Sequence, residues 1–355
     1  MRNIRELDNL EGKRVLLRSS LNVPLSENGE ILDDSRIKRA LPTIEYLQNK
    51  GAYVSVIGHM GRDGTESLDP VVRELAKHVK DFGTNVVLRE NLRQDPREVA
   101  NDDEFARELA GGQDIFVQDA FSVCHREHSS IVGVPKFLPS YAGLLLEEEV
   151  RALGMARNPE SPSLAIIGGA KFETKEPLIR ELVNKYDMVH VTGALANEFW
   201  KAKGLEIGLS KIEDGAVPED LLNNERVVLP DFVTVQNILG QIEKKYPHEV
   251  SGDEKIADAR MPEGLADNKS TTLWNGPAGY YEGGFTQYTH DIAYTLAESG
   301  ANIYSGGGDT VAAVKELGVL SKFTHVSTGG GAMLEFLLHG NLPGIDALRQ
   351  VQGKS

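Results

Sequence analysis

Five glycine-rich turns in the second half of the chain carry residue types that bind phosphate groups. Each follows a short apolar run, and they lie at residues 168–171 (GGAK), 191–197 (VTGALAN), 274–282 (WNGPAGYYE), 305–310 (SGGGDT) and 327–333 (STGGGAM). Glycine lets an anion approach the backbone, and free N–H groups at the start of a helix attract phosphate oxygens. A single glycine pair is usually an ordinary turn, but several after successive strand-like runs indicate an anion site.

Three charged side chains in these turns fit a magnesium nucleotide. Lys171 and Lys175 are four residues apart and share a face if a helix has begun there. Asp309 is the natural Mg²⁺ ligand, because Mg²⁺ prefers one or two carboxylates together with phosphate oxygens. The alternative is that Asp309 only caps the following helix. Neither GxxxxGK[ST] nor GxGxxG occurs, which excludes a Walker-type NTPase and the dinucleotide fingerprint.

Basic side chains recur at the expected strand ends of the first half. They are Arg36, His59, Arg62, Arg93, His125, Arg126 and His128. The chain has a net charge of −15, so a basic cluster within it calls for an explanation. Arginine binds phosphate and carboxylate through two parallel hydrogen bonds, and we interpret the cluster as an anion site. Zinc bound by the two histidines of HREH is an alternative, but no third ligand has convincing spacing.

The elements that must position these residues are those of an α/β fold. Short apolar runs lie at 15–17, 53–57, 86–88, 115–117, 164–167, 188–191, 227–229, 272–274, 303–304 and 325–326. Helix-period segments lie between them, for example at 35–50, 69–79 and 174–186. Runs that are apolar throughout are typical of parallel strands buried on both faces. Ligands bind such sheets at the carboxyl ends of the strands, where the turns and the basic residues fall. The polar stretch 244–269 is expected to be a loop excursion or a poorly ordered surface segment.

Length and composition predict two domains and exclude several classes of protein. A chain of 355 residues exceeds one compact core, and the helix-period segment at 144–158, followed by NPESP, marks the hinge. We predict one domain at 1–150, with the tail 336–355 packing back on it, and another at 151–335. No apolar run approaches the ~20 residues of a membrane span, and the charged N-terminus argues against secretion, so we expect a cytoplasmic protein. The negative charge disfavours nucleic acid and membranes as partners. The single cysteine, Cys124, excludes an internal disulfide and is expected to be a small buried residue.

Together the two halves predict a two-domain phosphotransferase. One domain would bind a small multiply anionic substrate, and the other would bind a magnesium nucleotide. Phosphoryl transfer depends on positioning and charge neutralisation more than on covalent chemistry. A carboxylate acceptor would need no general base, because it is already ionised at pH 7.

At these residues the sequence resembles the phosphoglycerate kinase family, nearly end to end and in collinear order. The motifs include RSSLNVPL (18–25), GHMGR (58–62), QDAFSVCHREHSS (118–130), GGAKFETK (168–175), WNGPAGYYE (274–282), GGGDT (306–310) and HVSTGGGAMLEFL (325–337). The resemblance implies two doubly wound parallel-sheet domains separated by a hinge cleft. It also implies reversible phosphoryl transfer between 1,3-bisphosphoglycerate and ADP, giving 3-phosphoglycerate and ATP, and a monomer more than an oligomer.

The resemblance further implies a role for each matching residue. The glycerate would lie against Ser20, Asn22, Arg36, His59, Arg62, Arg93 and Arg126, with Arg36 as the catalytic arginine. The nucleotide side would comprise Gly169, Lys171, Lys175, Glu282, Gly307, Gly308, Asp309 and Thr310. In that set the two lysines bind phosphate oxygens and act in catalysis, Glu282 binds the ribose and Asp309 binds Mg²⁺. The turn Gly329, Gly330 and Gly331 would meet the transferring group.

Three departures from the family pattern leave alternatives open. Ser20 stands where the family usually has aspartate, Thr192-Gly193-Ala194 stands where three glycines are common, and the stretch 258–271 is too short for the family's D-x-GP-x-[ST] loop and its helix. The loss of one hydrogen bond to the glycerate hydroxyl would cost about 1–3 kcal/mol. The alternatives are a paralogue acting on a related phosphorylated carboxylic acid and a non-catalytic ligand-binding paralogue.

Overall fold

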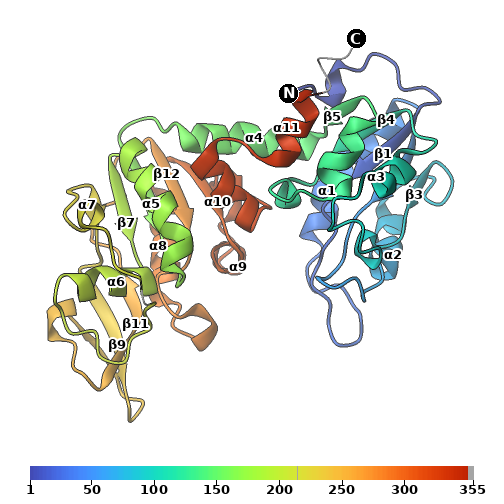
Figure 1. Ribbon diagram of the computed structural model, residues 1–355. Coiled ribbons are helices and arrows are strands. Elements are labelled where there is room, and N and C mark those ends of the chain that lie inside the picture. Colours follow the sequence, from blue (N-terminus) through green and yellow to red (C-terminus); the bar gives the residue numbers. More distant parts are fainter. Residues whose placement is uncertain (214, 351–355) are drawn as a thin grey trace. The chain divides into compact units, whose positions relative to one another are not determined.

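The computed structural model describes residues 1–213 and 215–350, and the chain divides into two compact units (Figure 1). One unit comprises Met1–Arg151 together with the segment that begins at His339, and the other is Ala152–Leu338. The chain passes from the first unit to the second within helix α4 (Leu144–Arg157). Each unit contains its own parallel sheet, which confirms the predicted α/β class with two doubly wound domains.

The first unit is built on a five-stranded parallel sheet in the order β3-β2-β1-β4-β5. The strands are β1 (Arg14–Arg18), β2 (Tyr53–Ile57), β3 (Val86–Leu88), β4 (Ile115–Gln118) and β5 (Ser140–Ala142). The sheet reverses its winding beside β1, since β2 and β4 pair with β1 on opposite sides. Ligands of doubly wound folds bind outside the carboxyl ends of strands at such a point.

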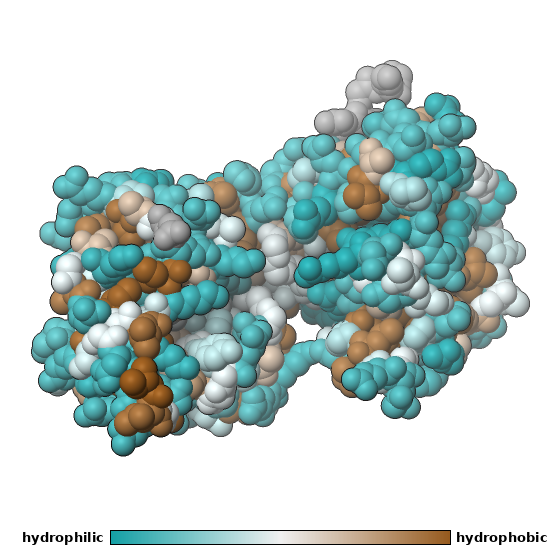
Figure 2. Space-filling model, turned by 60° about the horizontal axis from the view of Figure 1, so that its bottom comes forward, coloured by the Kyte–Doolittle hydropathy of each residue, from teal (hydrophilic) through white to brown (hydrophobic). Residues whose placement is uncertain are grey.

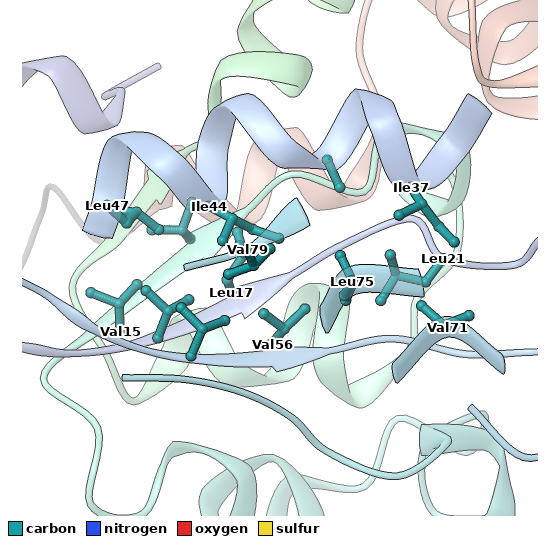
Figure 3. Packing of buried hydrophobic residues seen from close by; sticks show 14 of the residues in the cluster. Val15, Leu17, Leu21, Ile37, Ile44, Leu47, Val56, Val71, Leu75 and Val79 are labelled. Atoms are coloured by element: carbon teal, nitrogen blue, oxygen red, sulfur yellow. The ribbon is translucent and has the colours of Figure 1, made fainter. Parts of the chain in front are cut away.

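Four described α-helices lie wholly within the first unit, and the first two of them bury an apolar face in the core of its sheet. They are α1 (Ser35–Asn49), α2 (Asp69–His78), α3 (Asp103–Ala110) and α11 (Pro343–Gln350). Ile37, Ile44 and Leu47 of α1 face Val15 and Leu17 of β1 in a buried cluster (Figure 3). Their spacing places them on one side of the helix, as the sequence predicts. α1 continues through Pro42, and α11, the last helix of the sequence, contacts β5.

The second unit is built on a six-stranded parallel sheet in the order β14-β13-β12-β6-β7-β8. The strands are β6 (Ser163–Ile167), β7 (Met188–Val191), β8 (Val227–Val228), β12 (Thr271–Asn275), β13 (Asn302–Gly306) and β14 (His325–Val326). Every residue of β6 and β12 is buried, so both faces of the central strands are covered. All ten apolar runs of the sequence therefore form strands of the two sheets.

The helices of this unit follow the strands in a regular alternation. They are α5 (Phe172–Lys185), α6 (Ala194–Ala202), α7 (Glu219–Leu222), α8 (Gln287–Glu298), α9 (Gly308–Glu316) and α10 (Gly330–His339). Ile292 and Leu296 of α8 pack with Leu164 and Ile166 of β6 and with Trp274 of β12. Because α5, α6, α9 and α10 each begin directly after a strand, their amino ends lie at one edge of the sheet.

A small antiparallel sheet corrects the expectation for residues 244–269. Strands β9 (Phe232–Asn237), β10 (Ile242–Lys245) and β11 (Glu254–Arg260) pair in the order β10-β9-β11. The polar composition misled the prediction because an antiparallel sheet needs apolar residues on only one face. Val233, Val235 and Ala259 supply that face. Lys245 is opposite Val233 and therefore lies on the same face, where its Nζ pairs with Glu254 Oε1 at 2.8 Å. The polar stretch is therefore structured and belongs partly to a sheet.

The hairpin that joins β9 to β10 exposes apolar side chains. Ile238, Leu239 and Ile242 are 70%, 78% and 60% exposed. The space-filling view shows brown surface among the teal at the left, on the unit that contains this sheet (Figure 2). The described helices include none that is long and apolar enough to cross a bilayer.

Candidate functional site

Four of the glycine turns in the second unit meet at the carboxyl ends of adjacent strands. Gly168 and Gly276 follow β6 and β12, and the backbone N–H of Gly168 donates to the carbonyl of Asn275 at 2.9 Å. A Cβ on Gly168 would lie 2.2 Å from the carbonyl oxygen of Pro277. Gly193, at the start of α6, is also confined, since its Cβ would lie 2.8 Å from the same oxygen. Glycine at these positions is required by the close approach of the backbones.

Side chains tie these turns to the turn after β13. Asn275 Nδ2 donates to the carbonyl of Gly306 at 2.7 Å, and the backbone N–H of Gly276 donates to Thr310 Oγ1 at 2.8 Å. Gly307 has a φ of 102°, in the region that favours glycine, and begins α9 as its N-cap. Thr310, predicted to bind nucleotide, is fully buried, so its hydroxyl holds the neighbouring turn in place. These hydrogen bonds hold the glycine turns together at the edge of the sheet, where an anion can approach the backbone closely.

Lys175 projects into this edge from the first turns of α5. Its Nζ donates to the carbonyl of Gly168 and to Asn275 Oδ1, the latter at 3.2 Å. Burial lowers the pKa of Lys175 to about 8, against the opposing effect of the Asp309 carboxylate. A Cβ on Gly169 would lie 3.1 Å from the same Nζ, so Gly169 and Lys175 are in direct contact. A buried lysine whose ammonium is held by two neutral oxygens can exchange those partners for a charged phosphate oxygen.

The other charged residues predicted for the nucleotide are exposed. Lys171 is the N-cap residue of α5, and Asp309 lies in the first turn of α9 beside exposed Gly308. Among the described residues, no hydrogen bond is donated to the Asp309 carboxylate, and the N-cap position belongs to Gly307, so the helix-cap alternative is not supported. Glu282 is exposed in the short 3-10 helix Tyr281–Gly283.

The last glycine turn lies at the start of α10. Gly330 and Gly331 are exposed in its first turn, and Gly329 directly precedes them. The N–H of Gly329 donates to Ser327 Oγ at 3.2 Å, and the carbonyl of Gly329 accepts from Met333 at 2.8 Å. The turn follows β14 and so lies at the same edge of the sheet as the others, with the amino end of α10 contributing partial positive charge.

In the first unit, His59 is at the centre of the predicted basic cluster. It is 4% exposed, and its pKa is lowered to about 2 by burial and then by the positive charges of Arg18, Arg93 and Arg36. The imidazole is therefore neutral at pH 7. Arg18 Nη2 lies 3.1 Å from His59 Nδ1, and because a guanidinium only donates, Nδ1 accepts. The ring proton then resides on Nε2, which is available as a donor to an anion.

Arg36 and Asn22 are held together at the start of α1. Arg36 Nη1 donates to the carbonyl of Asn22 at 2.6 Å, and Asn22 Oδ1 accepts from the backbone N–H of Gly61 at 3.0 Å. Burial lowers the pKa of Arg36, opposed by the charge of Asp33. The contacts join the ends of β1 and β2, so the structure brings Arg36 to the same strand ends as His59.

Arg93, Arg62 and Arg126 complete the cluster. Arg93 Nη1 donates to the carbonyl of Gly61, and burial lowers the pKa of Arg93, with Glu98 opposing and the charges of Arg126 and Arg62 contributing. Arg62 and Arg126 are exposed. Cations held this close repel one another, and a bound anion would relieve this electrostatic repulsion.

The chain belongs to the phosphoglycerate kinase family. The family model described as "Phosphoglycerate kinase" matches residues 4–340. The chain is 40% identical to the phosphoglycerate kinase of Coprothermobacter proteolyticus and 39% identical to that of Rubrobacter xylanophilus, with 98% of each chain covered in both cases. A solved phosphoglycerate kinase from Coxiella burnetii superimposes with a TM-score of 0.85 at 36% identity, covering 98% of this chain and 99% of that one.

This phosphoglycerate kinase family member is shorter than its relatives within the aligned region. The alignment with the Coprothermobacter proteolyticus protein runs over 389 positions and covers 98% of the 355 residues of this chain, so at least 34 positions (389 − 355) are gaps in this chain. The connection from β11 to β12, residues 261–270, contains no helix in the structure. Instead Ala266 of this connection is buried against Leu164 and Ile166 of β6. A short loop thus covers part of the sheet in this member of the family.

Ser20, the departure in the glycerate site, is 2% exposed and shares a hydrogen bond with Ser122 Oγ. Its hydroxyl is therefore engaged by the protein. The zinc alternative has no support, because the described residues contain no group of three or more histidines, cysteines or carboxylates that could hold a metal. Cys124 is buried, and burial raises the pKa of its thiol, as expected for a packing residue.

Three buried residues that position the cluster were missed by the sequence reasoning. Arg18 Nε donates to Ser130 Oγ at 2.9 Å, and Ser130 Oγ donates to Glu98 Oε1 at 2.6 Å. Arg18 is 1% exposed, and its pKa is lowered to about 10 by burial, with Glu98 opposing. The sequence did contain a signal for this network, an arginine at the end of the apolar run RVLLR. A charge on a buried strand is costly unless it is paired, so buried partners for Arg18 could have been expected.

Proposed function

We propose that this chain catalyses reversible phosphoryl transfer between 1,3-bisphosphoglycerate and ADP, giving 3-phosphoglycerate and ATP. The observation that carries the proposal is the pair of preformed anion sites at strand ends. One is the basic cluster around His59, and the other is the glycine-lined edge that contains Lys175. A chain that had lost catalysis would have no reason to retain both, because clustered cations and confined glycines each cost stability.

In this proposal the first unit binds the glycerate substrate. Arg62, Arg93 and Arg126 bind its phosphate and carboxylate oxygens, and His59 Nε2 donates a hydrogen bond. Arg36 is the catalytic residue, because a guanidinium at the amino end of α1 can neutralise charge on the phosphoryl group during transfer. Arg18 is a positioning residue that fixes the tautomer and orientation of His59.

The second unit binds the nucleotide in this proposal. Lys171 and Lys175 bind phosphate oxygens, Glu282 binds the ribose, and the turns at Gly169 and Gly307 let the phosphates approach the backbone. The exposed carboxylate of Asp309 fits Mg²⁺, which takes few protein ligands and completes its shell with water and phosphate oxygens. Bound Mg²⁺ would supply charge neutralisation for the nucleotide phosphates.

Transfer then requires little beyond positioning and charge. The acceptor in the ATP-consuming direction is a carboxylate, which is ionised at pH 7 and attacks without a general base. The backbone N–H groups at the start of α10 would stabilise charge on the transferring phosphoryl oxygens. We also expect a cytoplasmic monomer.

A coupled assay with 3-phosphoglycerate and Mg·ATP tests the proposal. The wild-type chain should consume ATP only when 3-phosphoglycerate is present. Arg36→Ala should reduce the rate by at least a hundredfold, since it removes a charge aimed at the transition state. Circular dichroism must show that the variant is folded. A wild-type rate no higher than that of Arg36→Ala would reject the proposal.

A further inference from the structure

A pocket of about 440 Å³ lies in the first unit, between the segment after β3 and helix α3. Its lining comprises Arg89, Glu90, Asn91, Leu92, Gln94, Asp95, Pro96, Phe105 and Leu109. This volume falls in the range of small-molecule sites, which run from about 300 to 1,000 Å³. None of the residues given a role in phosphoryl transfer lines it.

The floor of the pocket is apolar. Phe105 and Leu109 are four residues apart on α3, so they share one face of the helix, and Leu92 of the short helix Leu92–Gln94 also lines the pocket. The three side chains are between 5% and 8% exposed. Arg97 stacks on the Phe105 ring, with its guanidinium carbon 5.0 Å from the ring centroid. The floor can therefore receive the apolar body of a small ligand.

Arg89 is the cation of the pocket. Among the residues that the structure describes, its side chain has no hydrogen-bond acceptor and no ion-pair partner, although it is partly buried. Burial lowers the pKa of Arg89. A partly desolvated guanidinium without a partner is poorly solvated and gains most when it binds an oxyanion.

The other polar groups of the lining are mostly engaged. Asn91 uses its whole amide on the backbone of residues 60, 66 and 93. The Asp95 carboxylate is paired with Arg97, with Oδ2 and Nη2 2.8 Å apart. Glu90 Oε1 accepts from the backbone N–H groups of Asn91 and Leu68 at 2.7 and 3.2 Å. The exposed amide of Gln94, which lines the same pocket as Arg89, remains available as a second donor.

We propose that this pocket binds a small monocarboxylate with an apolar body, its carboxylate on Arg89 and its body against Phe105 and Leu109. The carboxylate accepts two parallel hydrogen bonds from the guanidinium, and Gln94 donates to the remaining lone pairs. The apolar body displaces water from the helix face. The proposal stands apart from the transferase activity, because its residues point to a separate site.

Benzoate is a suitable probe, and its binding to the full chain can be followed by titration in protein NMR. We expect saturable binding in the millimolar range, consistent with a ligand of this size. Benzamide, which has the same shape without the charge, should bind at least tenfold more weakly. Inorganic phosphate, which lacks the apolar body, should not compete with benzoate at equal concentration.

Arg89→Met should weaken benzoate binding at least tenfold, whereas Arg73→Met, which removes an exposed arginine from α2, should leave it unchanged. Leu109→Gln should also weaken benzoate binding, because it makes the apolar lining polar while leaving Arg89 in place. Equal binding to wild type and Arg89→Met would overturn the proposal, as would the absence of saturable binding. Binding that is lost in Arg36→Met but kept in Arg89→Met would place benzoate in the basic cluster and would equally overturn it.

Discussion

The lowered pKa of Lys175 predicts an alkaline loss of activity that can be traced to one side chain. In the free protein, burial lowers its pKa from 10.5 to about 8. The difference corresponds to about 3 kcal/mol against the charged form, since each pKa unit is worth about 1.4 kcal/mol. Phosphate binding needs the charged form, which predominates below pH 8 and is lost as the pH rises through that value.

The assay is kcat/KM for Mg·ADP between pH 6 and 10, because this constant reports ionisations of the free enzyme. We expect a plateau up to about pH 7 and a fall of about tenfold between pH 7 and pH 9. Lys175→Arg keeps its charge throughout this range, so its profile should stay flat to about pH 9.5, from a lower plateau. Lys201→Arg, a change on exposed surface of α6, should keep the wild-type fall.

Two outcomes would refute this reasoning. A wild-type profile that stays flat to pH 9.5 would mean that Lys175 is not depressed in the free enzyme. A fall of the same size and midpoint in Lys175→Arg would assign the ionisation to another group.

Three further predictions concern stability. Arg18→Met should lower the free energy of unfolding by about 3–5 kcal/mol in urea titrations, because it removes the buried positive charge near the Glu98 carboxylate together with the donor to Ser130 Oγ. Arg14→Met, at the exposed end of β1, should cost about 1 kcal/mol or less. Similar losses in the two variants would contradict the buried network of Arg18, Ser130 and Glu98. Burial raises the pKa of Asp119 from 3.8 to about 7, so the folded state holds an extra proton in that window and the carboxyl's contribution to stability falls as pH rises from about 4 to 7. Asp119→Asn should remove that component, and an unchanged pH profile of unfolding would count against it. Gly168→Ala should lower the melting temperature by several degrees, because the added Cβ would lie 2.2 Å from a carbonyl oxygen. Gly154→Ala within α4 is the control, since its Cβ meets nothing within 4 Å and the change should be neutral or stabilising. Equal effects of the two changes on the melting temperature would argue against the confined turn.

Most strands could be predicted because parallel strands buried on both faces leave an unmistakable apolar run, as at Leu164–Ile167. β11 could not, because its buried residues include the charged Glu254 and Asp258, so it leaves no apolar run, and it forms a sheet only by pairing with β9. The site residues were predictable where a motif placed them at a strand end, as for His59 and Lys175. The buried hydrogen-bond network that holds His59 could not be predicted, since the hydrogen bond from Arg18 to Ser130 joins residues 112 positions apart.

The division of ligands between the two units is the central claim, and binding of each ligand to variants of each unit tests it most directly. Calorimetric titration would compare Arg126→Met and Lys171→Met, both exposed positions whose change should leave the fold intact. We predict that Arg126→Met weakens 3-phosphoglycerate at least tenfold and leaves Mg·ADP unchanged, and that Lys171→Met does the reverse. If either variant weakened the ligand assigned to the other unit and spared its own, the account would be contradicted.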